Sequence, residues 1–114
     1  MSDIKKVNQI NFDYNGKHYT LEFTPDTIKQ MEAAGFRISE LGEMPATRIE
    51  QLWAGAFMAN HRRNTSATVI RELYGQMKDK EALLTKLRDM YDSALNYLIP
   101  DEDEQGNIEW TATL

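Results

Sequence analysis

The side chains of this sequence that could carry out acid–base or metal chemistry are few and far apart. There are two histidines, His18 and His61, and no cysteine. We expect His18 to face Asp13 across a hairpin, and His61 to lie at a helix C-terminus, where a partly charged imidazole complements the helix dipole. The four serines lack the context of a nucleophile elbow, and the six glycines are scattered singly. The sequence therefore indicates a protein that is not an enzyme and that has no cofactor and no metal site.

Apolar side chains at helical spacing offer a different chemistry, which is the binding of another apolar surface. The stretch 52–59, LWAGAFMA, has no charged side chain, and its one hydrogen-bonding side-chain group is the Trp53 indole. A helix that is apolar all round is either central in a core or partly covered by another subunit. We favour the core, and the second alternative leaves a homo-oligomer open. Gly55 in the same stretch predicts close packing at that point.

The candidate partner-binding residues come from this stretch and from the end of the chain. They are Trp53, Phe57, Met58, Ile108 and Trp110. Methionine adds to this interpretation, because a thioether repacks readily against different partners. Met44 and Met77 therefore join Met58 as residues of an adaptable surface, with core packing as the alternative for each.

A β-hairpin over about residues 7–24 is the first element that must position these groups. Asn15-Gly16 stands between two alternating runs, and it suits a type I′ turn because both central residues need positive φ. A two-residue loop also determines the register. The predicted pairs are Tyr14–Lys17, Phe12–Tyr19 and Ile10–Leu21 on an apolar face, and Asp13–His18, Asn11–Thr20 and Gln9–Glu22 on a polar face. The apolar face must be covered by helices.

Helical periodicity predicts about four helices between residues 25 and 98. The predicted helices run from a Thr24 cap and Pro25 to Gly35, from about Pro45 to about Arg62, from a Ser66 cap to about Met77, and from Asp79 to about Leu98, with one further turn near Glu40. Pro100 ends the last helix. The predicted fold class is α+β, with an N-terminal β-hairpin packed on about four α-helices in a single domain of residues 1–98.

Charge divides the sequence into a neutral body and an acidic tail. Residues 1–98 contain all 13 Lys and Arg but only 13 of the 18 Asp and Glu, and residues 99–114 hold the other five acids. A neutral body lacks the basic footprint of a nucleic-acid-binding protein. The sequence has no apolar run of about 18 residues and no signal-peptide pattern at its start, so we expect no membrane span and a cytoplasmic protein.

The acidic tail at 99–114 has a pattern of its own. The run DEDE at 101–104 predicts a solvated, mobile spacer, and Gln105-Gly106-Asn107 has turn chemistry. Apolar residues then alternate from Ile108 to Leu114, as in a strand with one apolar face. Three outcomes stay open for this segment: a third strand on its own sheet, a strand added to a partner, or a disordered end.

One stretch of the body has the order of a DNA-binding helix-turn-helix. Residues 57–75 combine two predicted helices with a polar turn, and Arg62, Arg63 and Arg71 are available for phosphate contacts. The charges on the second helix cancel, however, because Arg71 is followed by Glu72. The sequence therefore favours a protein that binds no nucleic acid, with a small DNA-binding regulator as the lesser alternative.

Taken in order, these signals resemble one family. The hairpin and first helix FDYNGKHYTLEFTPDTIKQMEAAGF, the stretch LWAGAFMANHR, the following helix pair and the acidic end with a Trp are similar to the small tail assembly chaperones of long-tailed phages and prophages. The resemblance implies a non-catalytic protein of the bacterial host cytoplasm that binds the tape measure protein, works among other tail proteins and is absent from the finished virion. In many members a programmed frameshift adds a second domain. The rival class is a structural or adaptor protein that stays in the particle.

Overall fold

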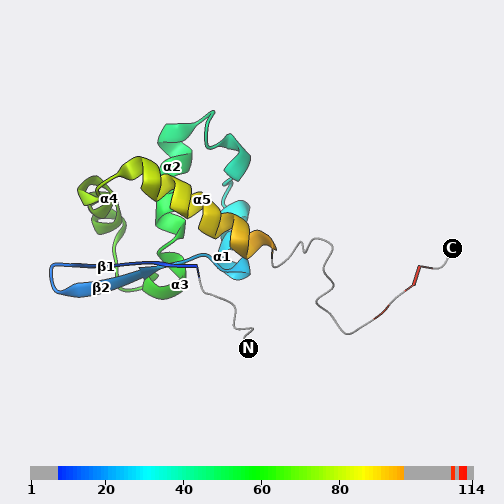
Figure 1. The fold of residues 1–114 in the computed structure, drawn as a ribbon, viewed down its shortest axis with the longest axis horizontal. Helices are drawn as coiled ribbons and strands as arrows, with labels where there is room; N and C mark the ends of the chain where they lie inside the picture. Colours follow the sequence, from blue (N-terminus) through cyan, green and yellow to red (C-terminus); the bar gives the residue numbers. More distant parts are fainter. Residues whose placement is uncertain (1–7, 97–108, 110, 113–114) are drawn as a thin grey trace.

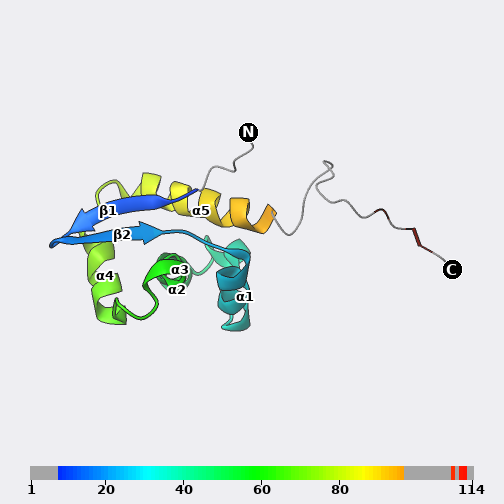
Figure 2. The ribbon, with the colours of Figure 1, turned by 90° about the horizontal axis from the view of Figure 1, so that it is seen from below.

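A two-stranded hairpin followed by helices makes up the chain, which confirms the predicted α+β class (Figure 1). The computed structural model describes residues 8–96, 109 and 111–112. The elements are β1 (Ile10–Tyr14), β2 (Lys17–Leu21), α1 (Pro25–Ala33), the 3₁₀ turn η1 (Ile38–Glu40), α2 (Pro45–Gly55), α3 (Met58–His61), α4 (Ala67–Gln76) and α5 (Lys80–Asn96). Helices α2, α4 and α5 lie on one side of the hairpin (Figures 1 and 2). The predicted domain boundary after residue 98 falls outside the described residues.

The hairpin has the predicted turn and the predicted register. Asn15 and Gly16 both have positive φ, at 51° and 80°. Five of the six predicted pairs form, from Tyr14 opposite Lys17 to Ile10 opposite Leu21. The sixth, Gln9 with Glu22, lies beyond the ends of both strands. Turn chemistry alone therefore placed every side chain of the hairpin on its correct face.

We expect Gly16→Val to lower the free energy of unfolding by about 1–3 kcal/mol. A Cβ at Gly16 would meet no atom within 4 Å, so the cost comes from the positive φ and not from a clash. Gly75 is the matched control, since it is equally open but lies within α4. Gly75→Ala should raise the free energy of unfolding by about 0.5 kcal/mol. Denaturant unfolding of Gly16→Val and Gly75→Ala measures both effects. If the free energy of unfolding changes by the same amount and in the same direction in both variants, the prediction is wrong.

Helix α1 begins and ends with local motifs that the sequence predicted. Thr24 caps it and forms a capping box with Thr27, whose backbone N–H donates to Thr24 Oγ1 at 3.1 Å. At the other end Gly35 has a φ of 105°. The N–H of Phe36 donates to Met31 O at 2.9 Å and that of Gly35 to Glu32 O at 3.0 Å. These two bonds are a Schellman motif, with Phe36 and Met31 as its buried apolar pair.

The prediction of one helix from 45 to about 62 is wrong at residues 56–57, where α2 ends and α3 begins. The N–H groups of Ala56 and Phe57 donate to carbonyls three residues earlier, at 3.1 Å each. The carbonyl of Ala56 accepts a 3.1 Å hydrogen bond from the N–H of Glu22, just after β2. A carbonyl drawn toward the hairpin is turned away from the next helical turn, so the helix breaks where it meets the sheet.

The break sets α3 beside the outer edge of β2 (Figure 2). There His61 Nε2 accepts from the N–H of Thr20 at 3.0 Å, and Asn60 Nδ2 donates to the Thr20 carbonyl at 3.2 Å. Together with the bond from Glu22, these contacts satisfy backbone groups that a bare strand edge would leave open. The β2 edge is therefore closed to pairing with another strand at this point.

Helix α2 lies at the centre of the helical layer and contacts α1, α4, α5 and η1. The apolar stretch 52–59, which begins in α2 and continues through the break into α3, is buried at Leu52, Trp53, Ala56 and Phe57, so its interpretation as a core element is confirmed for these residues. A Cβ on Gly55 would stand 2.5 Å from a Met31 side-chain atom, which confirms close packing at that point. The largest fully buried side chains are Trp53, Tyr91, Phe36, Phe57, Leu21, Ile28, Leu52, Leu87 and Met90.

Candidate partner-binding site

The two histidines lie apart and have different structural roles. His18 Nδ1 is 2.7 Å from Asp13 Oδ1 on the exposed face of the hairpin, as predicted. His61 is buried, and Nε2 accepts from a backbone N–H, which requires that nitrogen to be unprotonated. Nδ1 then carries the proton and donates to Asn64 Oδ1 at 3.1 Å. His61 therefore lies at the C-terminal end of α3, as predicted, and its ring joins α3 to β2.

In the described part of the chain, His18 and Asp13 form a close, exposed pair of acid–base side chains. No cluster of three His, Asp or Glu side chains with metal-site geometry occurs there. Burial, with the nearby carboxylates of Glu32 and Asp92, raises the pKa of Tyr91 to about 12. The phenol of Tyr91 therefore keeps its proton at neutral pH and is no base.

Two of the five candidate partner-binding residues belong to the core. Trp53 and Phe57 are each 1% exposed, and their rings meet edge to face with centroids 5.1 Å apart. The Trp53 indole N–H donates to Ile70 O at 2.7 Å, so its one polar group is satisfied by α4. A partner cannot cover these side chains beyond the small part that the core leaves free.

The other candidates differ in their exposure. Met58 is half-buried and lines a groove between α1 and α2 with Met31 and Ala34. Met44 is 45% exposed and Met77 is half-buried, so Met44 is the methionine most open to a partner. The remaining two candidates, Ile108 and Trp110, lie outside the described residues.

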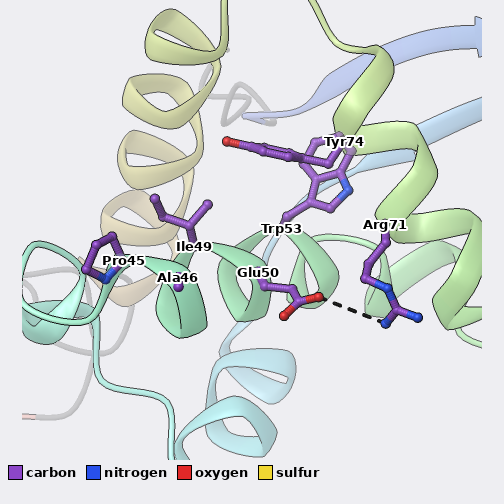
Figure 3. Close-up of a pocket in the computed structure, with 7 residues that line it drawn as sticks. All are labelled: Pro45, Ala46, Ile49, Glu50, Trp53, Arg71 and Tyr74. Carbon is purple, nitrogen blue, oxygen red and sulfur yellow. Dashed lines mark ion pairs between the residues drawn. The ribbon is translucent and has the colours of Figure 1, made fainter.

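An open apolar cleft lies between α2 and α4 (Figure 3). We call it the α2–α4 cleft; it has a volume of about 490 Å³ and is lined by Pro45, Ala46, Ile49, Glu50, Trp53, Arg71 and Tyr74. The Trp53 and Tyr74 rings form the aromatic floor of the cleft. Their centroids are 5.4 Å apart, and the angle between their planes is 63°. Pro45, Ala46 and Ile49 extend the apolar lining along α2. The cleft therefore presents the partly exposed Ile49 and Tyr74 and the exposed Pro45 and Ala46 to solvent, whereas Trp53 is covered.

Opposite charges stand at one side of this cleft. Glu50 from α2 and Arg71 from α4 are 3.9 Å apart, and both side chains are more than half exposed (Figure 3). Such a long, exposed ion pair contributes between zero and about 1 kcal/mol to stability. The pair is therefore free to exchange its contacts for charges on a bound molecule.

A family described as a domain of unknown function, DUF5055, matches residues 1–114. The chain belongs to the DUF5055 family. No curated protein and no solved structure matches it.

A second cleft of this DUF5055 domain adjoins the first. It has a volume of about 310 Å³ and lies between α2 and α5; its lining is Leu41, Gly42, Ile49, Glu81, Leu84, Thr85 and Arg88. Ile49 lines both clefts. The N-terminal half of α2 therefore has apolar hollows on both sides, next to the exposed Met44.

Of the residues that line the α2–α4 cleft, the sequence had singled out Trp53 as a candidate for partner binding and Arg71 as a candidate for phosphate contacts. Ile49 and Tyr74 are apolar residues of α2 and α4, and both are half-buried at the margin of the core. An apolar helical stripe that is wider than the area the core can cover leaves the residues at its edges partly exposed. This excess width is the signal in the sequence that could have identified Ile49 and Tyr74.

The first helix of the predicted helix-turn-helix corresponds to α3, which has four residues, and Arg62 from its end bonds Gln30 Oε1 on α1. This short turn docks on β2. Across the described ranges, no helix combines the length and the apolar composition that crossing a membrane requires.

Proposed function

We propose that this protein is a non-catalytic chaperone of phage tail assembly that binds the tape measure protein in the bacterial host cytoplasm and is absent from the mature virion. The α2–α4 cleft is the observation that carries the proposal, because it offers an apolar surface to another chain. The resemblance to small tail assembly chaperones, which extends over nearly the whole sequence, supplies the partner.

The physical chemistry of the cleft suits transient holding of an apolar chain. Its floor is aromatic and rigid, because Trp53 is held by its bond to Ile70 O and by the Phe57 and Tyr74 rings. Aromatic anchors give large contact area at low cost in side-chain entropy. The net charge of −5 keeps the protein soluble while this surface is open.

Co-purification with the tape measure protein tests the proposal. The full chain carries an affinity tag and is co-expressed with the tape measure protein of the same tail gene cluster. We expect the tape measure protein to become more soluble and to elute with the tagged chain, and we expect mass spectrometry of purified particles to find no copy of the chain.

Two outcomes would overturn the proposal. If the chain is found in purified particles in fixed ratio to the tail tube, it is a structural or adaptor protein. If the gene has no tail genes as neighbours and the tape measure protein elutes without the chain, the resemblance has no functional basis.

A further inference from the structure

We propose that the open edge of β1 is the docking site for residues 108–114 of a second copy of this chain, which add a third strand to the hairpin. Reciprocal exchange of these segments between two copies gives a closed dimer. This assembly needs no tape measure protein, so it goes beyond the proposed function and is tested separately from it.

The outer edge of β1 carries backbone groups that β2 does not bind. A two-residue loop makes Tyr14 and Lys17 a hydrogen-bonded pair, and the bonding then alternates along the strands. Asn11 and Asp13 therefore direct their N–H and C=O groups away from β2. Thr20, opposite Asn11, follows the same alternation, because its own N–H and C=O are bonded to α3. Among the described residues, no backbone group outside the hairpin bonds to Asn11 or Asp13, and β1 lies on the side of the sheet away from α3 (Figure 2).

The apolar side of β1 is also covered less than that of β2. Ile10 and Phe12 are half-buried and Tyr14 is 39% exposed, whereas their neighbours Tyr19 and Leu21 on β2 are buried. A strand beside β1 with apolar side chains on this face would extend the cover over these positions. The edge therefore fits an added strand that has one apolar face and one polar face.

Residues 108–114 have the alternation that this edge requires. The apolar residues of the segment are Ile108, Trp110, Ala112 and Leu114, and the polar ones are Glu109, Thr111 and Thr113. Of these, the structure describes Glu109, Thr111 and Ala112, which are exposed and lie in no strand. Those three residues do not occupy the edge of their own sheet, so we assign the segment to the β1 edge of a second copy.

The length of chain before the segment allows this exchange. Helix α5 ends at Asn96, and its last turns lie near the start of β1, where Asn8 Nδ2 donates to Asp89 Oδ2 at 2.9 Å. Residues 97–107 can span about 36 Å. Two copies that face each other with their β1 edges therefore lie within reach of each other's segments.

Side-chain size favours an antiparallel pair with Ala112 beside Phe12. In this register Trp110 lies beside Tyr14, which is the most exposed apolar residue of the strand. Aromatic pairs across neighbouring strands are stabilising, and the small Ala112 leaves room for the Phe12 ring.

Charge favours the same register. It places Thr111 beside Asp13 and Thr113 beside Asn11, so that no acid meets another acid. A shift by two residues would bring Glu109 beside Asp13, and like charges directly opposite each other are destabilising.

Paired proline substitutions in the full chain test this docking. In the assigned register the N–H of Thr111 points toward β1, and the N–H of Ala112 points away from it. Thr111→Pro should raise the dissociation constant of the dimer about tenfold, because proline has no N–H to donate to the ladder. Ala112→Pro is the matched control and should change the constant by less than about threefold. Light scattering over a range of concentrations measures both constants, and circular dichroism checks that the helices are unchanged.

Hydrogen exchange at the amides of Asn11 and Asp13 shows whether the edge is occupied, and we expect slower exchange in the dimer. If the chain is a monomer at every concentration and both amides are protected, the segment docks on its own sheet and the second copy is wrong. If the amides exchange freely, or if both prolines weaken the dimer equally, residues 108–114 do not occupy this edge. If only Ala112→Pro weakens the dimer, the assigned register is wrong.

Disulfide formation gives an independent measurement, because the sequence has no cysteine. Asp13→Cys in one copy and Thr111→Cys in another place two thiols opposite each other, at a Cα separation of about 5.5 Å that a disulfide accepts. Oxidation of this mixture should give a covalent dimer about fivefold faster than a mixture with Glu43→Cys in place of Asp13→Cys. Glu43 is exposed and lies just before α2, far along the chain from the hairpin. Equal rates in the two mixtures would reflect random collision and overturn the proposed pairing.

Discussion

Replacing Trp53 with alanine should lower the free energy of unfolding by about 3–5 kcal/mol. The side chain is 1% exposed, packs against the Phe57 and Tyr74 rings, and donates its indole N–H to Ile70 O at 2.7 Å. Its loss leaves a cavity at the point where α2 and α4 meet. For a domain of this size the change corresponds to a fall in Tm of roughly 12–20 °C. Thermal and urea unfolding followed by circular dichroism measure it.

Trp53→Phe separates ring packing from hydrogen bonding. It keeps an aromatic ring between Phe57 and Tyr74 but loses the N–H donor, so we expect a cost of about 1–2 kcal/mol. If Trp53→Ala costs no more than Trp53→Phe, the indole does not have the central packing role assigned to it.

Replacing His61 with alanine should cost about 2–4 kcal/mol of unfolding free energy. The change removes the acceptor of the Thr20 N–H, and it removes a ring that lies 5.2 Å from the Tyr19 ring and 6.2 Å from the Phe57 ring. A buried N–H without a partner is more costly than the hydrogen bond itself is worth. The loss should loosen α3 from β2, which hydrogen exchange at Thr20 would detect.

The other histidine is the matched control for this prediction. His18 lies on the exposed face of the same hairpin, and its contact with Asp13 is an exposed pair. We expect His18→Ala to change the free energy of unfolding by less than about 0.5 kcal/mol. Equal effects of the two substitutions, or faster exchange at Thr20 in both, would contradict the role given to His61.

Elements specified by short-range chemistry were predictable from the sequence. Asn15-Gly16 determined the turn and thereby the pairing of the hairpin, because a two-residue loop allows one register. Thr24 and Ser66 cap α1 and α4 as predicted, and Gly35 ends α1. Each of these features depends on neighbours within a few residues, so periodicity and cap chemistry contain the necessary information.

Long-range contacts account for what the sequence could not show. The predicted helix over 45–62 breaks because the Glu22 N–H reaches the Ala56 carbonyl, and those residues are brought together by the whole fold. The role of His61 has the same origin, since its acceptor nitrogen meets a strand that lies 41 residues earlier in the chain. The intrinsic helix propensities of residues 56–57 contain no information about a hydrogen-bond donor from a distant part of the sequence.

At the candidate site, too, some features were predictable from the sequence and others depended on the tertiary structure. The sequence by itself determined which residues are apolar and which helical stripes they form; it favoured a core position for the stretch 52–59 and left Trp53 and Phe57 as candidates for partner binding. Only the tertiary structure decided which parts of those stripes are covered: the neighbouring helices bury Trp53 and Phe57, while the edges at Ile49 and Tyr74 stay partly open. Burial depends on how helices far apart in sequence pack against one another, and hydrophobic periodicity describes one helix at a time.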